Sequence, residues 1–114
     1  MAELVQALSA QGPLPIKQTA TIETDAPTVV TLAGSVWAAD QDYMIGVVLF
    51  IDGQQVEVGQ IFANAMSTHL AFVPVTFSYT FADTPSQEHV FELGKLTGET
   101  MADENDHFLI TVQY

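Results

Sequence analysis

Apolar and polar residues alternate along short segments of this chain, which is typical of β-strands with one buried face. These segments are rich in valine, isoleucine, threonine and aromatic residues, and turn residues separate them at intervals of roughly 10 to 15 residues. The expected strands cover residues 19–24, 28–37, 43–51, 54–62, 69–81, 88–96 and 108–114. Because no substantial helical pattern lies between them, the sequence predicts an all-β, antiparallel two-sheet sandwich or barrel.

Turn and breaker residues add detail to this pattern. Asp52-Gly53 directly follows the longest apolar run and predicts a tight hairpin, because both central residues of such a turn need a positive φ. Gly59 suggests a β-bulge in the return strand. Pro74 has no N–H to donate, so it marks an edge or a bulge within its segment. Residues 83–87 are expected to form a turn.

The first residues differ from the rest of the chain. Residues 3–10 are good helix formers and predict at most one short helix. Gly12 and Pro13 would end that helix and begin an extended linker. We therefore expect a short N-terminal extension over residues 1–15 and a sandwich domain over residues 16–114. The extension is either a frayed tail or a segment that docks on a neighbouring chain.

The longest apolar run, residues 43–51, has apolar side chains on both faces of its expected strand. A two-layer sandwich covers one face of each sheet, and the chain offers no helix to cover the other. We therefore expect a second copy of the chain to cover it. Burial of each large side chain between the copies would contribute roughly 1.5 to 3 kcal/mol of transfer free energy to association. The alternative is cover from a barrel-like closure or from the N-terminal segment. The expected interface residues are Met44, Val48, Phe50 and Phe72.

Composition narrows the class of protein. With 114 residues the chain has the size of one domain, and a hydrophobic content of 48% argues against disorder. Two basic residues against fourteen acidic ones give a formal net charge of −12. Such a charge repels phosphate backbones and anionic lipids, so we expect neither a nucleic-acid nor a membrane partner. The chain contains no cysteine, and its N-terminus does not have the pattern of a signal peptide.

Two groups of side chains are candidates for a metal site. His69, His89 and His107 lack the short spacing of a typical histidine pair, so ordinary polar histidines are the alternative that we favour. The acidic loop over residues 99–106 offers oxygen ligands of the kind that calcium takes, although it does not match the register of an EF-hand. The candidate calcium ligands are Asp103, Glu104 and Asp106. The alternative is a solvated loop and a protein without a cofactor.

A ligand site is expected at the rim of the loop that follows the strand over residues 28–37. An aromatic ring in such a place can stack on a sugar or anchor a protein partner. The alternative is that the rings fill the core or an interface. The candidate ligand-binding residues are Trp37, Asp40, Asp42 and Tyr43.

Catalytic motifs are absent from the sequence. It has no phosphate-binding loop, no dinucleotide fingerprint and no nucleophile elbow. A pair of carboxylates can always be found among fourteen acidic residues, so it carries little weight for glycoside hydrolysis. We therefore expect a protein that is not an enzyme, and a small β-barrel enzyme is the weaker alternative.

Three segments resemble a known family. They are an apolar strand that ends in Asp52-Gly53, a segment in which His69 precedes an apolar-proline pair at Pro74, and a His89 strand followed by the terminal segment over residues 103–112. Together they resemble the small jelly-roll head domains of the complement and tumour-necrosis-factor type found in bacteriophage and bacterial fibres. The turn before His89 lacks the glycine that this family has.

The resemblance implies a jelly-roll sandwich that forms a homotrimer and binds at an exposed tip. We therefore expect a head domain of a phage or surface fibre that recognises a host surface or a glycan, exposed on a virion or cell surface. The alternative is a structural protein that decorates a capsid or takes part in virion assembly, docking on a virion protein through its N-terminal segment.

Overall fold

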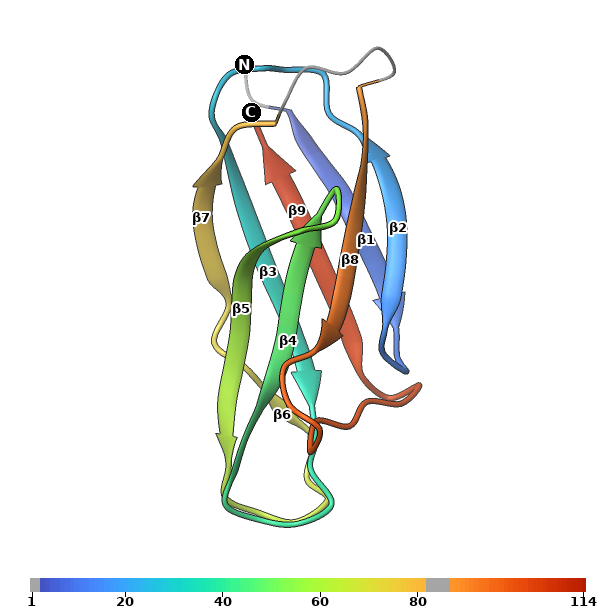
Figure 1. The fold of residues 1–114 in the computed structure, drawn as a ribbon, viewed down its shortest axis with the longest axis vertical. Coiled ribbons are helices and arrows are strands. Elements are labelled where there is room, and N and C mark those ends of the chain that lie inside the picture. Colours follow the sequence, from blue (N-terminus) through green and yellow to red (C-terminus); the bar gives the residue numbers. More distant parts are fainter. Residues whose placement is uncertain (1–2, 82–86) are drawn as a thin grey trace.

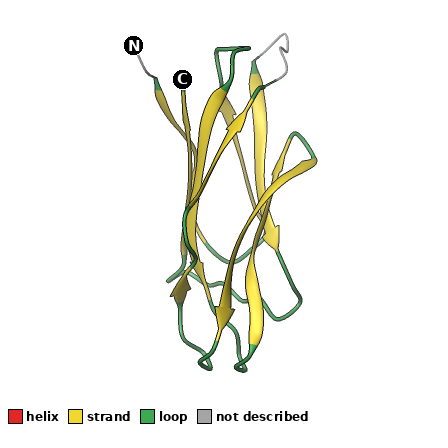
Figure 2. Ribbon diagram, turned by 90° about the vertical axis from the view of Figure 1, so that its left-hand side faces the viewer, coloured by secondary structure: helices red, strands yellow, loops and turns green. Residues whose placement is uncertain are grey.

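The structure, a computed structural model, describes residues 3–81 and 87–114 as two packed antiparallel sheets (Figures 1 and 2). The strands are β1 (Leu4–Gln11), β2 (Ile16–Thr21), β3 (Thr28–Val36), β4 (Tyr43–Ile51), β5 (Gln54–Ala63), β6 (Leu70–Ala71), β7 (Val75–Tyr79), β8 (Glu88–Lys95) and β9 (His107–Gln113). This confirms the predicted all-β, two-sheet sandwich and is consistent with a jelly-roll-like fold. The described residues contain no helix that could span a membrane.

The chain crosses repeatedly between the two sheets. One sheet has the order β1-β9-β3-β6, with β7 also paired to β3, and the other has the order β2-β8-β4-β5. The first and last strands are antiparallel neighbours, so the start of β1 and the end of β9 both lie at the upper end of the molecule in Figure 1. The molecule is elongated, with extents of 45 × 21 × 21 Å.

The core lies between the sheets and takes the inward side chains of both. Along β3, β8 and β9 the large buried side chains alternate with less buried ones, as expected for strands with one buried face. The principal core residues are Leu8, Val30, Leu32, Ile45, Val47, Leu49, Ile51, Phe72, Phe81, Phe91, Leu93, Phe108, Ile110 and Val112.

The N-terminal segment is a strand and not the short helix that its residues allowed. Residues 4–11 form strand β1, which pairs with β9 along its whole length. Leu8 lies opposite Ile110 and is completely buried. Burial of this side chain between the sheets outweighs the weak helical preference of a short segment. The extension expected over residues 1–15 therefore contains a strand of the five-stranded sheet.

The hairpin prediction at Asp52-Gly53 is confirmed, with φ angles of 53° and 84° at the two residues. The predicted bulge at Gly59 is wrong, because the register shifts instead beside Leu49 and Phe50. Gly59 has another role. A Cβ atom there would lie 2.5 Å from the ring of Phe72, so only glycine lets that ring approach the strand.

The segment from His69 to Phe81 is two strands rather than one. The predicted edge or bulge at Pro74 is instead a break, because the strand pairing stops between β6 and β7 at this proline. The turn expected over residues 83–87 lies outside the described residues, apart from Gln87.

The structure places the four expected interface residues in different environments. Met44 is 44% exposed on the outer face of β4, whereas Val48 is nearly buried by its neighbours on the same face. The ring of Phe50 lies over Gly94 and is half-buried. Phe72 is only 2% exposed and belongs to the core of its own chain. The expectation for Phe72 is therefore corrected, because the inward turn of the chain before Pro74 removes it from the surface.

Candidate functional site

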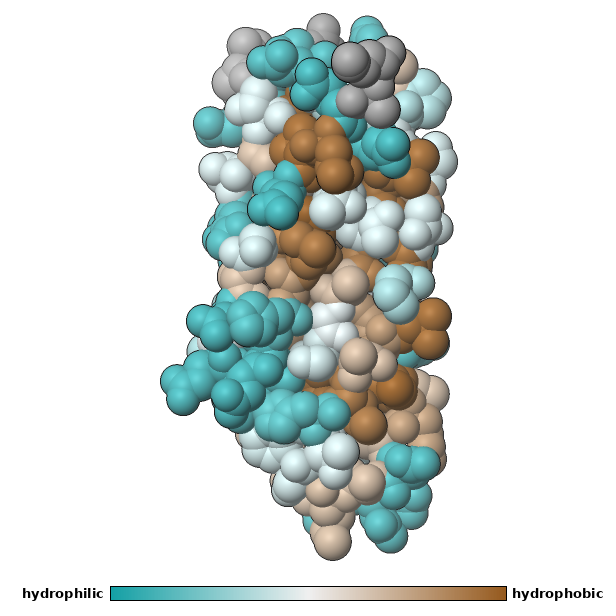
Figure 3. Space-filling view, turned by 180° about the vertical axis from the view of Figure 1, so that it is seen from behind, coloured by the Kyte–Doolittle hydropathy of each residue, from teal (hydrophilic) through white to brown (hydrophobic). Residues whose placement is uncertain are grey.

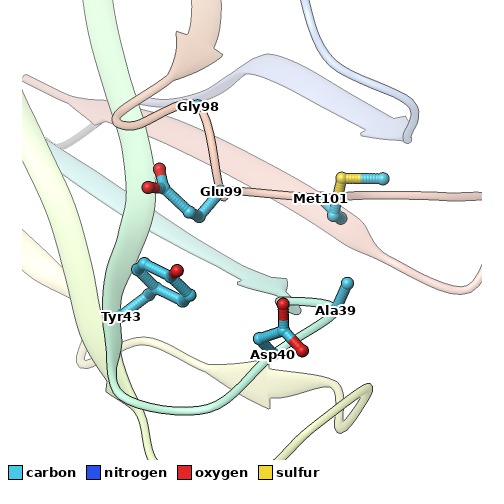
Figure 4. Close-up of a pocket in the computed structure, with 6 residues that line it drawn as sticks. All are labelled: Ala39, Asp40, Tyr43, Gly98, Glu99 and Met101. Carbon is cyan, nitrogen blue, oxygen red and sulfur yellow. The ribbon is translucent and has the colours of Figure 1, made fainter.

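An open pocket of about 180 Å³ lies toward the end of the sandwich opposite the chain termini (Figures 1 and 4). Two loops form it, one between β3 and β4 and the other between β8 and β9. The residues that line it are Ala39, Asp40, Tyr43, Gly98, Glu99 and Met101.

Backbone and side-chain hydrogen bonds fix these loops. Trp37 and Met101 form an isolated antiparallel bridge, with N···O distances of 3.0 and 2.8 Å. The Thr97 hydroxyl donates to the carbonyl of Met44 at 3.0 Å, and the Gly46 N–H donates to Thr100 Oγ1 at 3.2 Å. The loop that carries Glu99 is therefore tied to β3 and β4, and the pocket is preformed.

The chemistry of the pocket is aromatic and anionic. Figure 4 shows the ring of Tyr43 with the carboxylates of Asp40 and Glu99 around the same opening. All three side chains are exposed. Within residues 3–81 and 87–114, neither carboxylate forms an ion pair, so both oxygens of each remain free to accept hydrogen bonds from a ligand.

The structure brings together two of the four predicted ligand-binding residues, Asp40 and Tyr43. Asp42 does not line the pocket; it ends the loop with a φ of 71°, and its N–H donates to the carbonyl of Ala63. Trp37 does not line it either, because its ring packs against His69 with centroids 5.8 Å apart. Sequence reasoning missed Glu99 as a pocket residue, although it lies in the acidic loop that the sequence had marked.

A second group of polar side chains lies beside Trp37, whose ring contacts that of His69. Asp106 is completely buried, and its Oδ1 is 2.7 Å from both the hydroxyl of Ser35 and Nδ1 of His69. Its Oδ2 accepts the N–H of Asp103 at 2.9 Å. His69 Nε2 faces Asp103 Oδ2 at 3.8 Å. Both oxygens of the buried carboxylate thus have partners, as burial of a charge requires.

The hydrogen bond from Asp106 raises the pKa of His69 above its ordinary value. Partial desolvation opposes this rise in pKa, whereas the charges of Asp106 and Asp103 add to it. The pair therefore favours an imidazolium ring beside two carboxylates.

The same group bears on the expected calcium site. Asp103 and Asp106 lie with His69 such that one ligand atom from each is within 4.8 Å of the others. Glu104 is not part of this group; its backbone carbonyl accepts a hydrogen bond from the side chain of Gln11. An imidazole with two carboxylates suits a borderline transition metal better than calcium, which takes oxygen ligands. Calcium remains a prediction.

The other histidines have ordinary structural places. His89 is buried, and its Nδ1 lies 2.6 Å from Oδ2 of Asp52 in the hairpin turn. The Val90 N–H donates to the other carboxylate oxygen of Asp52 at 2.8 Å. His107 is exposed at the start of β9. No two of the three histidines belong to one potential metal group among the described residues.

No family model matches the chain, and no curated protein matches it either. Among solved structures, it is similar to the crystal structure of the CBM36-1 domain of a multidomain xylanase from the hindgut metagenome of Trinervitermes trinervoides. The identity is 14%, the similarity covers 99% of this chain and 95% of that chain, and the TM-score is 0.49. A similarity at this level indicates no shared ligand, and the strand pairing described above defines the fold by itself.

Proposed function

We propose that this chain is a non-enzymatic binding module that takes a glycan in the pocket of Asp40, Tyr43 and Glu99. The supporting observation is one exposed tyrosine ring between two carboxylates that have no ion-pair partner among the described residues. An aromatic face packs on the apolar face of a sugar ring, and carboxylate oxygens accept hydrogen bonds from its hydroxyl groups. The binding energy comes from a preformed site with few polar groups.

The arrangement supports binding rather than catalysis. Both pocket carboxylates are exposed, whereas the general acid of a glycosidase sits in surroundings that exclude water. The two histidine–aspartate pairs do not line the pocket; each histidine is hydrogen-bonded to its own aspartate.

The position of the pocket also favours a head domain. The pocket lies toward one end of a 45 Å molecule, and the paired terminal strands end at the other (Figure 1). A domain held at the end that carries its termini would therefore present the pocket outward. This supports the expected role as the tip of a phage or bacterial surface fibre, for which the homotrimer remains a prediction.

A titration tests the pocket. We expect chemical-shift changes at Ala39, Tyr43 and Gly98 when the labelled protein is mixed with neutral oligosaccharides from a panel of different linkages. Tyr43→Ala should weaken binding by about tenfold, since a stacked ring contributes roughly 0.5 to 1.5 kcal/mol. Glu99→Gln should weaken it by less, because the amide retains one acceptor oxygen.

Asp42→Asn is the matched control, since Asp42 lies on the same loop but outside the pocket, and it should bind as the wild type does. Shift changes that cluster away from both loops would contradict the site. Shortened oligosaccharides in the mixture after incubation would contradict the non-enzymatic assignment.

A further inference from the structure

The outer face of the five-stranded sheet carries no formal charge. Strands β1, β3, β6, β7 and β9 contain no Asp, Glu, Lys or Arg, although the chain has fourteen acidic and two basic residues. The four-stranded sheet differs, because Glu57, Glu88, Glu92 and both lysines lie on its strands. Figure 3 shows the five-stranded face, on which hydrophobic residues stand among residues of intermediate hydropathy and hydrophilic ones, the latter forming a large block along its left side.

The strand registers arrange the outward side chains of this face in rows. The amide and hydroxyl side chains can each donate and accept hydrogen bonds. The first row is Leu4, Gln113, Val29 and Ser78, the second is Gln6, Thr111, Thr31 and Thr76, and the third is Ser9, Leu109 and Ala33. A surface of this kind is self-complementary, because two copies can supply both partners of every hydrogen bond.

Three of these side chains, Leu4, Val29 and Leu109, are exposed aliphatic groups. The rows contain no aromatic ring, so the face has no platform on which a sugar could stack. Exposed aliphatic groups among small polar ones match the composition of a protein contact better. The chemistry of the face therefore favours a protein partner over a glycan.

Charge selects among protein partners. A basic partner would be drawn to the acidic loops and would gain nothing from an uncharged surface. Two copies of this chain repel each other, since each carries −12, and they approach most easily where neither has to bury a carboxylate. We propose that the outer face of the five-stranded sheet is the contact surface between two copies of this chain, packed sheet against sheet.

The available area is sufficient for a specific but modest interface. Strands β1, β9, β3 and β7 are about 4.8 Å apart and their residues rise about 3.3 Å each, so the face measures roughly 500 Å² before the relief of the side chains is counted. Two such faces bury about 1,000 Å², which is near the lower limit of specific interfaces. The same patch on both copies gives a two-fold dimer rather than a ring.

The proposal is an alternative to the homotrimer and to the β4 interface that the sequence predicts, and it does not depend on the glycan pocket. Sedimentation velocity on the full chain tests it, from dilute solution to the highest soluble concentration and at low and high salt. The wild type should move from 12.4 kDa toward twice that mass as concentration rises. High salt should strengthen the association, because it screens the repulsion between two acidic copies.

Two matched variants locate the interface. Leu109→Glu places a carboxylate in the uncharged face at a site that is 38% exposed, and it should leave the protein monomeric throughout. Met44→Glu makes a similar change on the other sheet at a site that is 44% exposed, and it should associate as the wild type does. Circular dichroism and thermal unfolding check that each variant folds, and Val29→Glu replaces Leu109→Glu if that variant does not.

Three results would overturn the proposal. The first is a wild type whose mass stays at 12.4 kDa at high concentration and high salt. The second is a dimer that is lost in Met44→Glu but kept in Leu109→Glu, and the third is an assembly of three copies. Loss of oligosaccharide binding in Leu109→Glu but not in Tyr43→Ala, with a monomeric wild type, would identify the face as a glycan surface instead. Failure of the pocket alone would leave the dimer intact, so the two proposals are distinguishable.

Discussion

Two histidine–aspartate pairs hold opposite parts of the sandwich, and they are built in opposite ways. In the pair of His69 and Asp106 the carboxylate is completely buried while the histidine side chain is 37% exposed. In the pair of His89 and Asp52 the histidine side chain is 2% exposed and the carboxylate is 43% exposed. The two distances are nearly equal, at 2.7 and 2.6 Å. The two pairs therefore differ in which partner is buried away from solvent and not in the length of the contact.

This difference predicts which residue of each pair carries stability. Removal of a buried side chain leaves a cavity and takes the partner from every group that it binds inside the chain. An exposed member can be replaced by water or by a residue that keeps the hydrogen bond, so the buried member stays satisfied. We therefore expect Asp106 to matter more than His69, and His89 to matter more than Asp52.

The largest expected effect is that of Asp106→Ala. The change removes the charged acceptor of three hydrogen bonds, from Ser35, His69 and the N–H of Asp103, and it should lower the free energy of unfolding by about 3 to 5 kcal/mol. Urea denaturation followed by circular dichroism measures it. His69→Gln is the paired variant and should cost about 1 kcal/mol, because its site is open to water. Equal losses for the two variants would contradict the claim that the buried member of this pair contributes more stability than the exposed one.

His89→Ala is expected to have the next largest effect. Its ring is buried and packs against Phe81 with centroids 4.8 Å apart, so the cavity should lower the free energy of unfolding by about 2 to 4 kcal/mol. His89→Phe keeps the ring and should recover about half of this. Asp52→Asn should cost less than about 1 kcal/mol, since asparagine tolerates the φ of 53° and keeps an acceptor for Val90. A larger loss in Asp52→Asn than in His89→Ala would reverse the second half of the comparison.

Neither pair could be predicted from the sequence, for a physical reason. Both pairs join residues that are 37 positions apart, and no local periodicity connects such positions. The turn at Asp52-Gly53 was predicted because its positive φ angles are a local requirement. The bond from Asp52 to His89 depends on β8 lying beside that turn, which is a property of the strand order.

The same distinction explains the rest of the fold and the site. Alternation along β9 and the continuous apolar run of β4 are local patterns, so they predicted both strands. Residues 4–11 form a strand because Leu8 completes a core built by distant residues. In the pocket, Asp40 and Tyr43 are near each other in the chain, and the sequence predicted both as ligand-binding residues. Glu99 lies on another loop, and only the strand order places it beside them.

The third prediction uses the raised pKa of His69, which results first from its hydrogen bond to Asp106. A histidine whose pKa is higher in the folded chain than in the unfolded one holds its proton more tightly when folded. Its contribution to stability is complete below the unfolded pKa of about 6.5 and is lost as pH rises through the folded pKa. The wild type should therefore lose stability relative to His69→Gln as pH rises above about 6.5.

Urea unfolding of the wild type and of His69→Gln across this pH range measures the difference between their free energies of unfolding. Titration of all the groups that the two proteins share cancels in this difference. The effect should be smaller than that of Asp106→Ala, because His69 is partly exposed and its charge is screened. A difference that stays constant across this range would show that the histidine does not change its proton affinity on folding, and one that grows with pH would show that folding lowers its pKa.

The smallest expected effect is that of Asp103→Asn. Its Oδ2 is 3.8 Å from His69 Nε2, both side chains are more than a third exposed, and such ion pairs contribute about 0 to 1 kcal/mol. The amide oxygen can still accept the N–H of Asn105, so the loop should keep its shape. The change should lower the free energy of unfolding by less than about 0.5 kcal/mol, and by less still at high salt. A loss as large as that in Asp106→Ala would mean that the exposed carboxylate of Asp103 holds the loop as firmly as the buried one. That result would contradict the claim that the buried partner contributes most of the stability.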